Sequence, residues 1–339
     1  MDKKRSVGIL ATGSYTPDRV LSNFDLEKMV ETSDEWIVSR TGIRERRICS
    51  TEQASSDLAY EAAKKALAKA NISAEQLDMI IVATVTPDTM FPSTACILQE
   101  KLGAKRAAAV DLSAACTGFL YGITTATQFI ANGFYKHILV VGVETLSKIT
   151  NYKDRNTCVL FGDGAGAAVI GEVKEGFGFQ SFELGADGSG GPLLCLPAGG
   201  SRIPASSESV ENDLHYLAMA GGEVFKFAVR VMNSATEAVL AKAGVDRENI
   251  DLLVPHQANK RIIDSAVQRF GLSEEKVAIN LDRYGNMSSA SIPVALDEAV
   301  EAGRIKEGDN VILVGFGGGL TWGATLLKWS TTPAEGSGQ

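Results

Sequence analysis

Apolar positions along the chain follow two spacings, one typical of amphipathic helices and one typical of buried strands. The segment SSDLAYEAAKKALAKANI, residues 55–72, begins with Ser and Asp, contains strong helix formers and has one apolar face, so it predicts a helix. The runs MIIVATV, residues 79–85, and ILVVGV, residues 138–143, are almost entirely apolar, which predicts strands covered on both faces of a sheet. Strands that alternate with helices predict an α/β protein with parallel sheets and right-handed crossovers.

The same patterns predict further elements in both halves of the chain. Helices are expected over 92–103, 117–133, 223–244, 259–271 and 287–305, and strands over 106–112, 250–257, 276–280 and 310–319. Residues 185–209 are rich in Gly and Ser, which predicts a long surface loop.

Two pairs of similar segments indicate an internal duplication. ANISAEQLDMII begins at Ala70 and AGVDRENIDLLV at Ala243, while HILVVGV begins at His137 and NVILVGF at Asn310; both pairs are 173 residues apart. We therefore expect an N-terminal half, residues 1–173, and a C-terminal half, residues 174–339. Because ligands of α/β folds bind at the carboxyl ends of strands, polar residues at those ends are the candidates for chemistry.

Composition and charge narrow the class of protein. The chain has 339 residues, of which 45% are hydrophobic and 22% charged, and its net charge is −8. This charge argues against non-specific nucleic-acid binding, which needs a basic surface. No run of 18 apolar residues is present, which argues against a membrane span, and the N-terminal segment has no apolar core of a signal peptide, so we expect a cytoplasmic protein.

Cysteine and histidine usage argues against disulfides and metal. The five cysteines are odd in number and form no CxxC pair, and the three histidines are not at metal-ligand spacing. Four of the cysteines are expected to be buried structural residues, namely Cys49, Cys96, Cys158 and Cys195.

Cys116 has a different setting. In VDLSAACTGF, residues 110–119, it stands where a predicted strand gives way to a predicted helix. A helix N-terminus favours a thiolate, and the small neighbouring residues allow another molecule to approach the sulfur. The segment therefore predicts a nucleophile.

Three further motifs place polar groups at predicted strand ends. PHQAN contains His256, YGNMSSAS places Asn286 after a turn, and GFGGGLTWG offers backbone N–H groups that form either an oxyanion hole or a tight bend. Together with Cys116 these residues predict a covalent mechanism in which His and Asn serve a developing oxyanion. The residues alone leave acyl transfer and hydrolysis open, since His could equally act as a general base oriented by Asn.

The chain resembles β-ketoacyl-acyl carrier protein synthase III, the initiating condensing enzyme of type II fatty acid synthesis, within the thiolase superfamily. The resemblance runs from about Ser6 to Trp329 and rests on the motifs TSDEWIVSRTGIRERR, ACTGF, LFGDGAGA, HQANKRI, YGNMSSASIP and GFGGGLTWG. Elongating synthases differ by a second histidine at the place of Asn286, thiolases by a second cysteine where this chain has GFGGG, and plant-type polyketide synthases lack the DEWIVSRTGI stretch. The resemblance implies a duplicated thiolase-like α/β fold with five αβαβα layers, and a homodimer.

The resemblance also implies a mechanism. Cys116, His256 and Asn286 form the catalytic triad, and the backbone N–H groups of Cys116 and Gly318 form the oxyanion hole. Cys116 accepts a short acyl group from acyl-CoA, and malonyl-acyl carrier protein then loses CO₂ and attacks the acyl-cysteine, with no cofactor and no metal. The alternatives are a condensing enzyme of secondary metabolism, a cysteine acyltransferase or thioesterase on acyl-CoA, and a binding module that has lost its chemistry.

Substrate-binding residues are implied by the same resemblance. Trp36 and Arg40 would flank the CoA adenine, and Phe91 would reach across the dimer to close the acyl pocket, so that short straight and branched primers are accepted and long chains rejected. Gly222 stands where several relatives carry a polar or basic side chain near the CoA pantetheine. Further implied contacts are Thr32, Arg155 and Asn259 for CoA, and Arg261, Lys226 and Lys260 for the acidic carrier protein.

Overall fold

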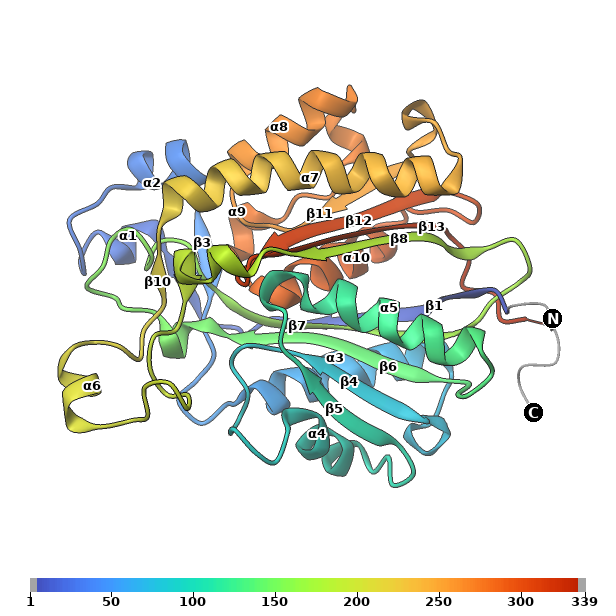
Figure 1. The fold of residues 1–339 in the computed structure, drawn as a ribbon, viewed down its shortest axis with the longest axis horizontal. Coiled ribbons are helices and arrows are strands. Elements are labelled where there is room, and N and C mark those ends of the chain that lie inside the picture. The colour runs from blue at the N-terminus through green and yellow to red at the C-terminus, as the bar shows by residue number, and fades with distance from the viewer. Residues whose placement is uncertain (1–4, 335–339) are drawn as a thin grey trace.

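Two β-sheets alternate with three layers of helices in the computed structural model, which describes residues 5–334 (Figure 1). One outer layer contains α3 (Ser55–Ala70) and α4 (Thr94–Leu102), and the other contains α7 (Gly221–Ala243) and α8 (Lys260–Phe270). The inner layer contains α5 (Gly118–Ala131) and α10 (Ser291–Glu301). This is the five-layered αβαβα arrangement expected above.

The two sheets are mixed rather than parallel. The first has the order β1 (Val7–Tyr15), β7 (Asp163–Glu172), β6 (Ile138–Thr145), β4 (Met79–Ala83), β5 (Ala108–Leu112). The second has the order β11 (Leu252–Pro255), β12 (Asn310–Gly317), β13 (Thr321–Lys328), β8 (Gly178–Ala186).

Parallel pairing is confined to the strands that helices connect. Strand β4 is parallel to β5 and β6, and β11 is parallel to β12, whereas β1, β7, β13 and β8 pair antiparallel. The expectation of parallel sheets was therefore wrong for half of each sheet. The reason is that β7 and β13 follow β6 and β12 without a helix between them, and such connections make antiparallel neighbours.

Helices α5 and α10 lie in a core shared by both sheets. Leu120 and Ile123 of α5 and Ile292 and Leu296 of α10 are buried in one cluster with apolar side chains of β6 and β12. The outer helices cover the opposite sheet faces, α3 and α4 on the first sheet and α7 and α8 on the second. Both sheets are thus covered on both faces, as their apolar sequences predicted.

Equivalent elements begin at the offset found in the sequence. Met79 begins β4 and Leu252 begins β11, while Gly118 begins α5 and Ser291 begins α10, each pair 173 residues apart. The last strand of the first sheet ends at Glu172 and the first strand of the second begins at Gly178, which supports our proposal of two halves, 1–173 and 174–339.

Two segments differ from their predicted structure. Residues 276–280 form no strand: a 3-10 turn (Glu274–Lys276) is followed by a single bridge between Val277 and Leu253. The side chain of Gln257 accepts from the backbone N–H of Asn280 and donates to the carbonyl of Ala278, so side-chain hydrogen bonds take the place of a ladder.

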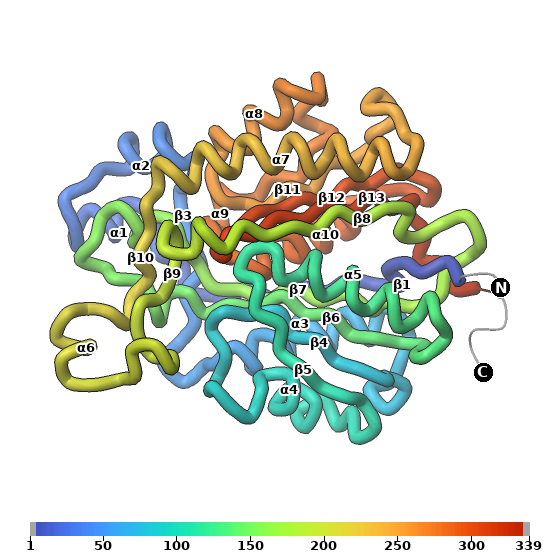
Figure 2. Tube along the Cα trace, in the orientation of Figure 1, coloured from blue at the N-terminus to red at the C-terminus, as the bar shows by residue number. Residues whose placement is uncertain are grey.

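The predicted loop 185–209 is partly ordered into regular structure. It contains a 3-10 turn (Gly188–Leu193) and β9 (Leu194–Cys195), which pairs with β10 (Ala218–Met219), and α6 (Ser207–Glu211) begins within it. Figure 2 shows this segment extending from the end of the molecule that also carries the remaining short elements, α1 (Asn23–Leu26), α2 (Asp34–Thr41), β2 (Val20–Ser22) and β3 (Glu45–Arg47). A helix α9 (Leu281–Tyr284) precedes α10. Over residues 5–334 the helices are too short or too polar to cross a membrane.

Candidate active site

Cys116 lies in a strained 3-10 turn, the nucleophile turn (Ala115–Thr117), between β5 and α5. Ala115 has a left-handed φ of 44°, which turns the chain sharply from the strand into the helix. The thiol residue is 6% exposed. At Gly118, which begins α5, an added Cβ would lie 2.8 Å from the Cβ of Ala83, so the small residues noted in the sequence allow the helix to pack closely on β4.

Strand β12 lies between Cys116 and His256. An added Cβ at Gly317 would lie 2.7 Å from the Cys116 nitrogen, and one at Gly315 would lie 3.5 Å from the His256 Cβ. The glycines of this motif therefore permit a close backbone approach, as the sequence suggested.

His256 is a neutral, unpartnered imidazole at the end of β11. Its backbone N–H donates to the carbonyl of Val314 on β12 over 2.8 Å, and its ring meets the ring of Phe316 edge-on at 5.4 Å. The residue is 1% exposed, and neither ring nitrogen has a hydrogen-bond partner. Burial lowers the pKa of His256 to about 3, so the ring is uncharged at neutral pH.

Asn286 is fixed by its backbone and by the oxygen of its amide. Its N–H donates to the carbonyl of Leu160 and its carbonyl accepts from the N–H of Gly162, over 2.8 and 3.0 Å. The Oδ1 atom accepts from the backbone N–H of Ser288 over 2.8 Å. This leaves the amide NH₂ group as the hydrogen-bond donor for another molecule.

A second 3-10 turn, the serine turn (Ser288–Ala290), connects Asn286 to the thiol. The Ser288 hydroxyl is hydrogen-bonded to the Cys116 side chain. Strand β12 and the serine turn therefore bring the three predicted residues, Cys116, His256 and Asn286, to one place, although they are far apart in the sequence.

Burial keeps Cys116 protonated. It raises the pKa of the Cys116 thiol to about 12; the bond with Ser288 lowers this pKa and the negative charge of Glu144 raises it. The expectation of a thiolate at a helix N-terminus therefore does not describe the free protein, because desolvation outweighs the helix end.

Two backbone N–H groups near the thiol are free to bind an oxyanion. Within residues 5–334, neither the N–H of Cys116 nor that of Gly318 donates to another residue. An added Cβ at Gly318 would lie 3.6 Å from the Ala115 Cβ and 3.2 Å from the carbonyl oxygen of Leu194, so β9 passes next to this position. The hydroxyls of Thr117 and Thr321 lie 2.8 Å apart and join the nucleophile turn to the turn that contains Gly318.

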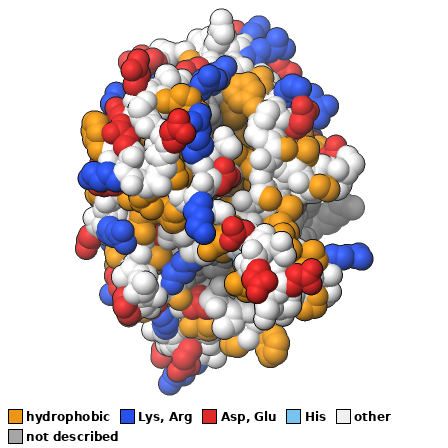
Figure 3. Space-filling view, turned by 90° about the vertical axis from the view of Figure 1, so that its left-hand side faces the viewer, with side chains coloured by type: hydrophobic (Ala, Val, Ile, Leu, Met, Phe, Trp, Pro, Cys, Tyr) orange, Lys and Arg blue, Asp and Glu red, His pale blue; other side chains and the backbone are white. Residues whose placement is uncertain are grey.

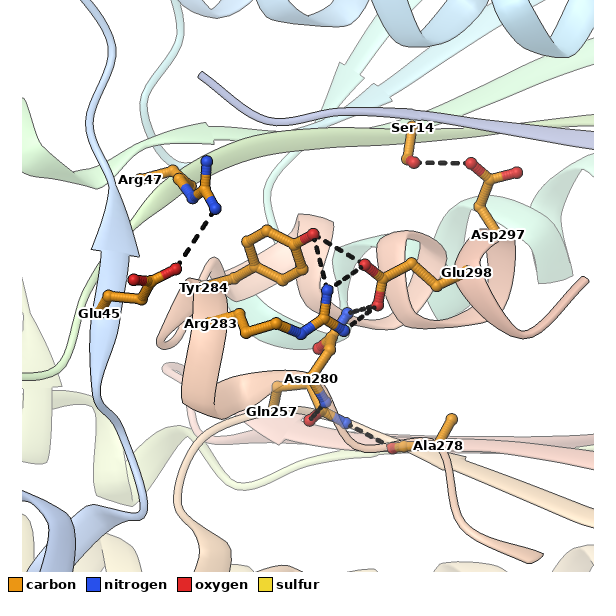
Figure 4. A network of polar contacts seen from close by, with 10 residues as sticks. All are labelled: Ser14, Glu45, Arg47, Gln257, Ala278, Asn280, Arg283, Tyr284, Asp297 and Glu298. Carbon is orange, nitrogen blue, oxygen red and sulfur yellow. Dashed lines mark hydrogen bonds and ion pairs between the residues drawn. The ribbon is translucent and has the colours of Figure 1, made fainter. Parts of the chain in front are cut away.

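A buried polar network supports the segments around His256 and Asn286 (Figure 4). Glu298 of α10 accepts a bidentate pair from Arg283 over 2.9 Å each, and further bonds from the Tyr284 hydroxyl and the Asn280 amide. Asn280 in turn donates its backbone N–H to Gln257, the neighbour of His256. The network ties the end of β11 and the turn before Asn286 to the same inner helix.

The other cysteines only partly match their predicted structural role. Cys49 and Cys158 are buried, and burial raises their thiol pKa values to about 12 and about 11. Cys96 is exposed and Cys195 is half-buried, so the expectation of a buried residue was wrong for Cys96. The described part of the chain holds no group of three His, Cys, Asp or Glu residues arranged to bind a metal.

Comparison with known proteins identifies the family. Residues 110–188 match the family described as 3-Oxoacyl-[acyl-carrier-protein (ACP)] synthase III, and residues 240–329 match its C-terminal part. The chain is 61% identical over 325 residues to the β-ketoacyl-[acyl-carrier-protein] synthase III of Desulfitobacterium hafniense strain Y51, with 96% of this chain and 98% of that relative covered. It belongs to the β-ketoacyl-[acyl-carrier-protein] synthase III family.

Further similarities agree with this assignment. The relative of the same description from Caldanaerobacter subterraneus subsp. tengcongensis is 61% identical over 330 residues, 97% of this chain and 100% of the relative. The solved structure of the synthase III from Thermus thermophilus superposes with a TM-score of 0.89 at 51% identity, covering 96% of this chain and 100% of that one. The chain is thus an acyltransferase-class condensing enzyme that initiates fatty acid synthesis, on a thiolase-like α/β fold, and the family uses acyl carrier protein and acyl-CoA.

The residues implied for CoA in this enzyme gather around α2. The guanidinium of Arg155, not that of Arg40, lies over the Trp36 ring, 4.9 Å from its centroid. The Asn259 amide donates to the carbonyl of Arg40 over 3.0 Å, so Asn259 joins the start of α8 to the end of α2. Thr32 has a buried hydroxyl oxygen without a hydrogen-bond partner.

The three residues implied for the carrier protein lie near the N-terminal ends of α7 and α8. Lys226 pairs with Glu223 at 2.8 Å and Lys260 with Asp264 at 2.6 Å, while the Arg261 guanidinium lies 5.3 Å from the Phe225 ring centroid. Exposed pairs within one helix are weak, so both lysines remain available to a partner. The face of the molecule at this end shows hydrophobic, basic and acidic side chains side by side (Figure 3).

Two more residues from the sequence lie on the surface. Phe91 is 86% exposed, so nothing in its own chain covers it. Gly222 lies in the first turn of α7 with no atom within 4 Å of an added Cβ, so a side chain would fit there.

Sequence reasoning missed Glu144 and Ser288. Glu144 is fully buried at the end of β6, and Ser288 contacts both Glu144 and Cys116. A signal for Glu144 was present, because it is a charged residue within an apolar run of strand length.

Proposed function

We propose that Cys116 carries the acyl group during the condensation of a short acyl-CoA primer with malonyl-acyl carrier protein. The observation that supports this most strongly is the gathering of the Cys116 thiol, the unpartnered His256 ring and the amide donor of Asn286 around the free N–H groups of Cys116 and Gly318. A nucleophile beside two backbone donors is the arrangement that thioester exchange needs.

In the first half of the reaction the Cys116 sulfur attacks the thioester carbonyl of acyl-CoA. The carbonyl oxygen becomes an oxyanion, which the N–H groups of Cys116 and Gly318 bind. The C–S bond to CoA then breaks, and the acyl group stays on Cys116. Splitting the condensation in this way lets one small site handle two large substrates in turn.

In the second half His256 and Asn286 serve the malonyl thioester. A neutral imidazole and a carboxamide NH₂ can both donate hydrogen bonds to the thioester oxygen without bringing a charge into a buried site. Loss of CO₂ then leaves an enolate held by these donors, and its carbon attacks the acyl-cysteine. The low pKa of His256 suits this role, because the ring stays neutral when the negative charge develops.

We further propose that Trp36, Arg155, Thr32, Asn259 and Arg40 bind CoA, and that Arg261, Lys226 and Lys260 dock the acidic carrier protein. The grouping of the first set around α2, and of the second set at the start of α7 and α8, supports a continuous path for a carrier-bound or CoA-bound thioester. The chemistry needs no cofactor, and we place the enzyme in the cytoplasm.

A homodimer is the last part of the proposal. Strand β5 is at the edge of the first sheet, with Val110 42% exposed, and the nearby Met90 and Phe91 are 77% and 86% exposed. An unpaired edge strand and exposed apolar side chains are typical of a surface that pairs with another chain. A second copy that covers them would place its Phe91 toward the partner's acyl pocket. Light scattering during gel filtration would show twice the chain mass.

The experiment that tests the proposed function is acylation followed by intact-mass measurement. Incubation with acetyl-CoA or isobutyryl-CoA should add one acyl group to the wild type and none to Cys116→Ser, and malonyl-acyl carrier protein should then remove it as a 3-oxoacyl product. A thioesterase would release free acid without malonyl-acyl carrier protein, and a binding module would show no added mass. Either result would overturn the proposal.

A further inference from the structure

A buried carboxylate lies one residue behind the Cys116 thiol. Glu144 ends the apolar part of β6 and is 0% exposed. Among the described residues no lysine or arginine compensates its charge. A carboxylate in such a place is costly unless hydrogen bonds hold it, so its partners are informative.

Glu144 is held by donors from both halves of the chain. Its Oε2 atom accepts from the Thr86 hydroxyl, the Val85 backbone N–H and the Thr84 hydroxyl, over 2.7, 3.1 and 3.3 Å. Its Oε1 atom accepts from the hydroxyls of Ser288 and Ser289, over 3.0 and 2.9 Å. All of these groups donate, so the site is built for the ionised carboxylate.

Only one of the two serines also reaches the thiol. Ser288 is hydrogen-bonded to Cys116, whereas the second partner of Ser289 is the carbonyl of Ala83, at 2.8 Å. A hydroxyl has a single hydrogen, and Ser288 gives it to Glu144. The thiol must therefore donate its own hydrogen to the Ser288 oxygen, which makes a continuous chain from S–H through O–H to carboxylate.

We propose that Ser288 and Glu144 together accept the proton of Cys116 when the acyl group arrives. As the sulfur bonds to the thioester carbon, its proton moves to the Ser288 oxygen and the Ser288 proton moves to Glu144 Oε1. The C–S bond to CoA breaks and the CoA thiolate takes a proton from water. When the enolate later displaces Cys116, the sulfur recovers its proton along the same path, so Ser288 and Glu144 return to their starting state.

The other candidate acceptor is less suited to the task. The His256 ring has no partner on either nitrogen, and burial holds its pKa near 3, so it is a weak base. Burial instead raises the pKa of Glu144, which strengthens its carboxylate as a proton acceptor. Ser288 is thus a catalytic residue, and Glu144 is a positioning residue that acts through it.

This inference rests on the proposed function, because it needs Cys116 to be the nucleophile. The test is the single-turnover rate of Cys116 acylation by acetyl-CoA, followed by quenching and intact-mass measurement. Ser288→Ala removes the hydroxyl but keeps the backbone N–H that holds Asn286. Near pH 7 we expect Ser288→Ala and Glu144→Gln to slow acylation about 100-fold, the usual effect of losing a general base.

Ser289→Ala is the matched control, since it removes a donor to the same oxygen of Glu144 without touching the thiol. We expect it to slow acylation by much less than Ser288→Ala. Ser288→Gly guards against a folding defect, because glycine readily adopts the φ of 45° found at this position.

The pH dependence separates proton transfer from a merely structural role. The titratable groups that face Cys116 are Glu144 of β6 and, beside β12, His256 at the end of β11, which stays neutral above pH 6. Hydroxide takes over the role of the missing acceptor as the pH rises, so the deficit of Ser288→Ala should shrink at least about tenfold between pH 7 and about pH 9.5.

Three results would overturn the inference. They are wild-type acylation rates in both Ser288 variants, an equal loss in Ser289→Ala, or a deficit that does not change with pH. If the wild type itself is never acylated, the proposed function fails instead, so the two failures are distinguishable.

Discussion

Ala115 and Ser288, which are 173 residues apart, share the same left-handed backbone conformation, with φ values of 44° and 45°. Each begins a 3-10 turn that leads into an inner helix, α5 in one half and α10 in the other. Few non-glycine residues adopt this conformation, so its recurrence at the offset of the duplication shows that both halves keep the same strained turn.

The two turns have diverged in chemistry. The residue after Ala115 is Cys116, and the residue after Ser288 is Ser289, whose hydroxyl holds the carbonyl of Ala83 and the carboxylate of Glu144. One turn thus presents the thiol, and its counterpart supplies two hydroxyls to the carboxylate behind that thiol. The two turns pack together, with an added Cβ at Gly118 only 3.6 Å from Ser289.

The roles of His256 and Asn286 can be separated from that of Cys116. We expect His256→Ala and Asn286→Ala to accept an acyl group on Cys116 but to lose at least about 100-fold in decarboxylation of malonyl-acyl carrier protein, since both groups serve the enolate. Acyl-adduct mass and release of labelled CO₂ measure the two steps. A variant that cannot be acylated would show that its missing side chain acts as the base of the first step.

Cys116 should react slowly with alkylating reagents at neutral pH. Its pKa lies near 12 instead of 9.0, so the thiolate is scarce until the pH is strongly alkaline, whereas the exposed Cys96 is accessible. Peptide mapping after iodoacetamide treatment should show Cys96 modified first and Cys116 modification rising steadily above pH 9. Rapid labelling of Cys116 with a plateau below pH 8 would contradict this.

The same shift affects stability. A group whose pKa is raised on folding stabilises the folded state below its unfolded pKa and loses that contribution as the pH rises through and beyond it. For Cys116 the window runs from about pH 9 to about pH 12, so Cys116→Ala should be less sensitive to alkaline unfolding than the wild type.

Arg155 should matter more than Arg40 for CoA binding. Its guanidinium lies 4.9 Å from the Trp36 ring centroid, whereas an adenine between them needs about 7 Å, two contact distances of about 3.5 Å. Arg155 must therefore move aside to form the second face of the sandwich. We expect Trp36→Ala and Arg155→Ala to weaken acetyl-CoA binding by roughly tenfold, about 1.4 kcal/mol, and Arg40→Ala to weaken it less.

Calorimetry on the Cys116→Ser background measures this binding without turnover. A larger effect from Arg40→Ala would instead support the pairing of Trp36 with Arg40 that the sequence suggested.

Phe91 should limit the length of the primer. It is 86% exposed in the single chain, and we expect a partner subunit's copy to close the acyl pocket. Phe91→Thr should then raise kcat/KM for hexanoyl- and decanoyl-CoA relative to acetyl- and isobutyryl-CoA, by roughly 10–200-fold, the range that one methylene in an apolar pocket is worth. Met90→Thr, at the neighbouring exposed position, is the control. A wild type that already prefers decanoyl-CoA would identify a long-chain relative.

Much of the fold could be predicted because the strongest signals are local. The periodicity of residues 55–72 matched α3 to within two residues, and the offset of 173 marked equivalent elements. Strand β7 was missed because its sequence, DGAGAAVIGE, is dominated by small residues without β propensity. The strand predicted at 276–280 was wrong because Gln257, twenty positions away, satisfies its backbone groups.

The candidate site was partly predictable for the same reason. Cys116 and His256 stand at visible transitions in the hydrophobic pattern. The link from Glu144 to Ser288 joins residues 144 positions apart, and no local pattern encodes such a pair. The protonation of Cys116 was wrongly expected because burial depends on packing that only the folded chain creates.

Arg46 should be a strong determinant of both stability and the position of Asn286. Its side chain is fully buried, and its guanidinium donates to the Asn23 side-chain oxygen and to the carbonyls of Leu21 and Val159, over 2.8–3.0 Å. Burial without a neighbouring carboxylate lowers the pKa of Arg46 to about 10, so the residue remains charged at neutral pH. It anchors Val159, which directly precedes Leu160, the acceptor of the Asn286 backbone N–H.

Arg46→Ala would leave three buried oxygens without donors, each costing about 1–3 kcal/mol, and would empty the space of a large side chain. We expect the free energy of unfolding to fall by at least about 3 kcal/mol, measured by urea denaturation, and decarboxylation to fall more than acylation in whatever protein remains folded. Arg47→Ala, at the neighbouring and less buried position, is the control and should cost under about 1 kcal/mol. Equal losses in the two variants, or a stable Arg46→Ala protein, would show that the hydrogen bonds of Arg46 do not hold this part of the site.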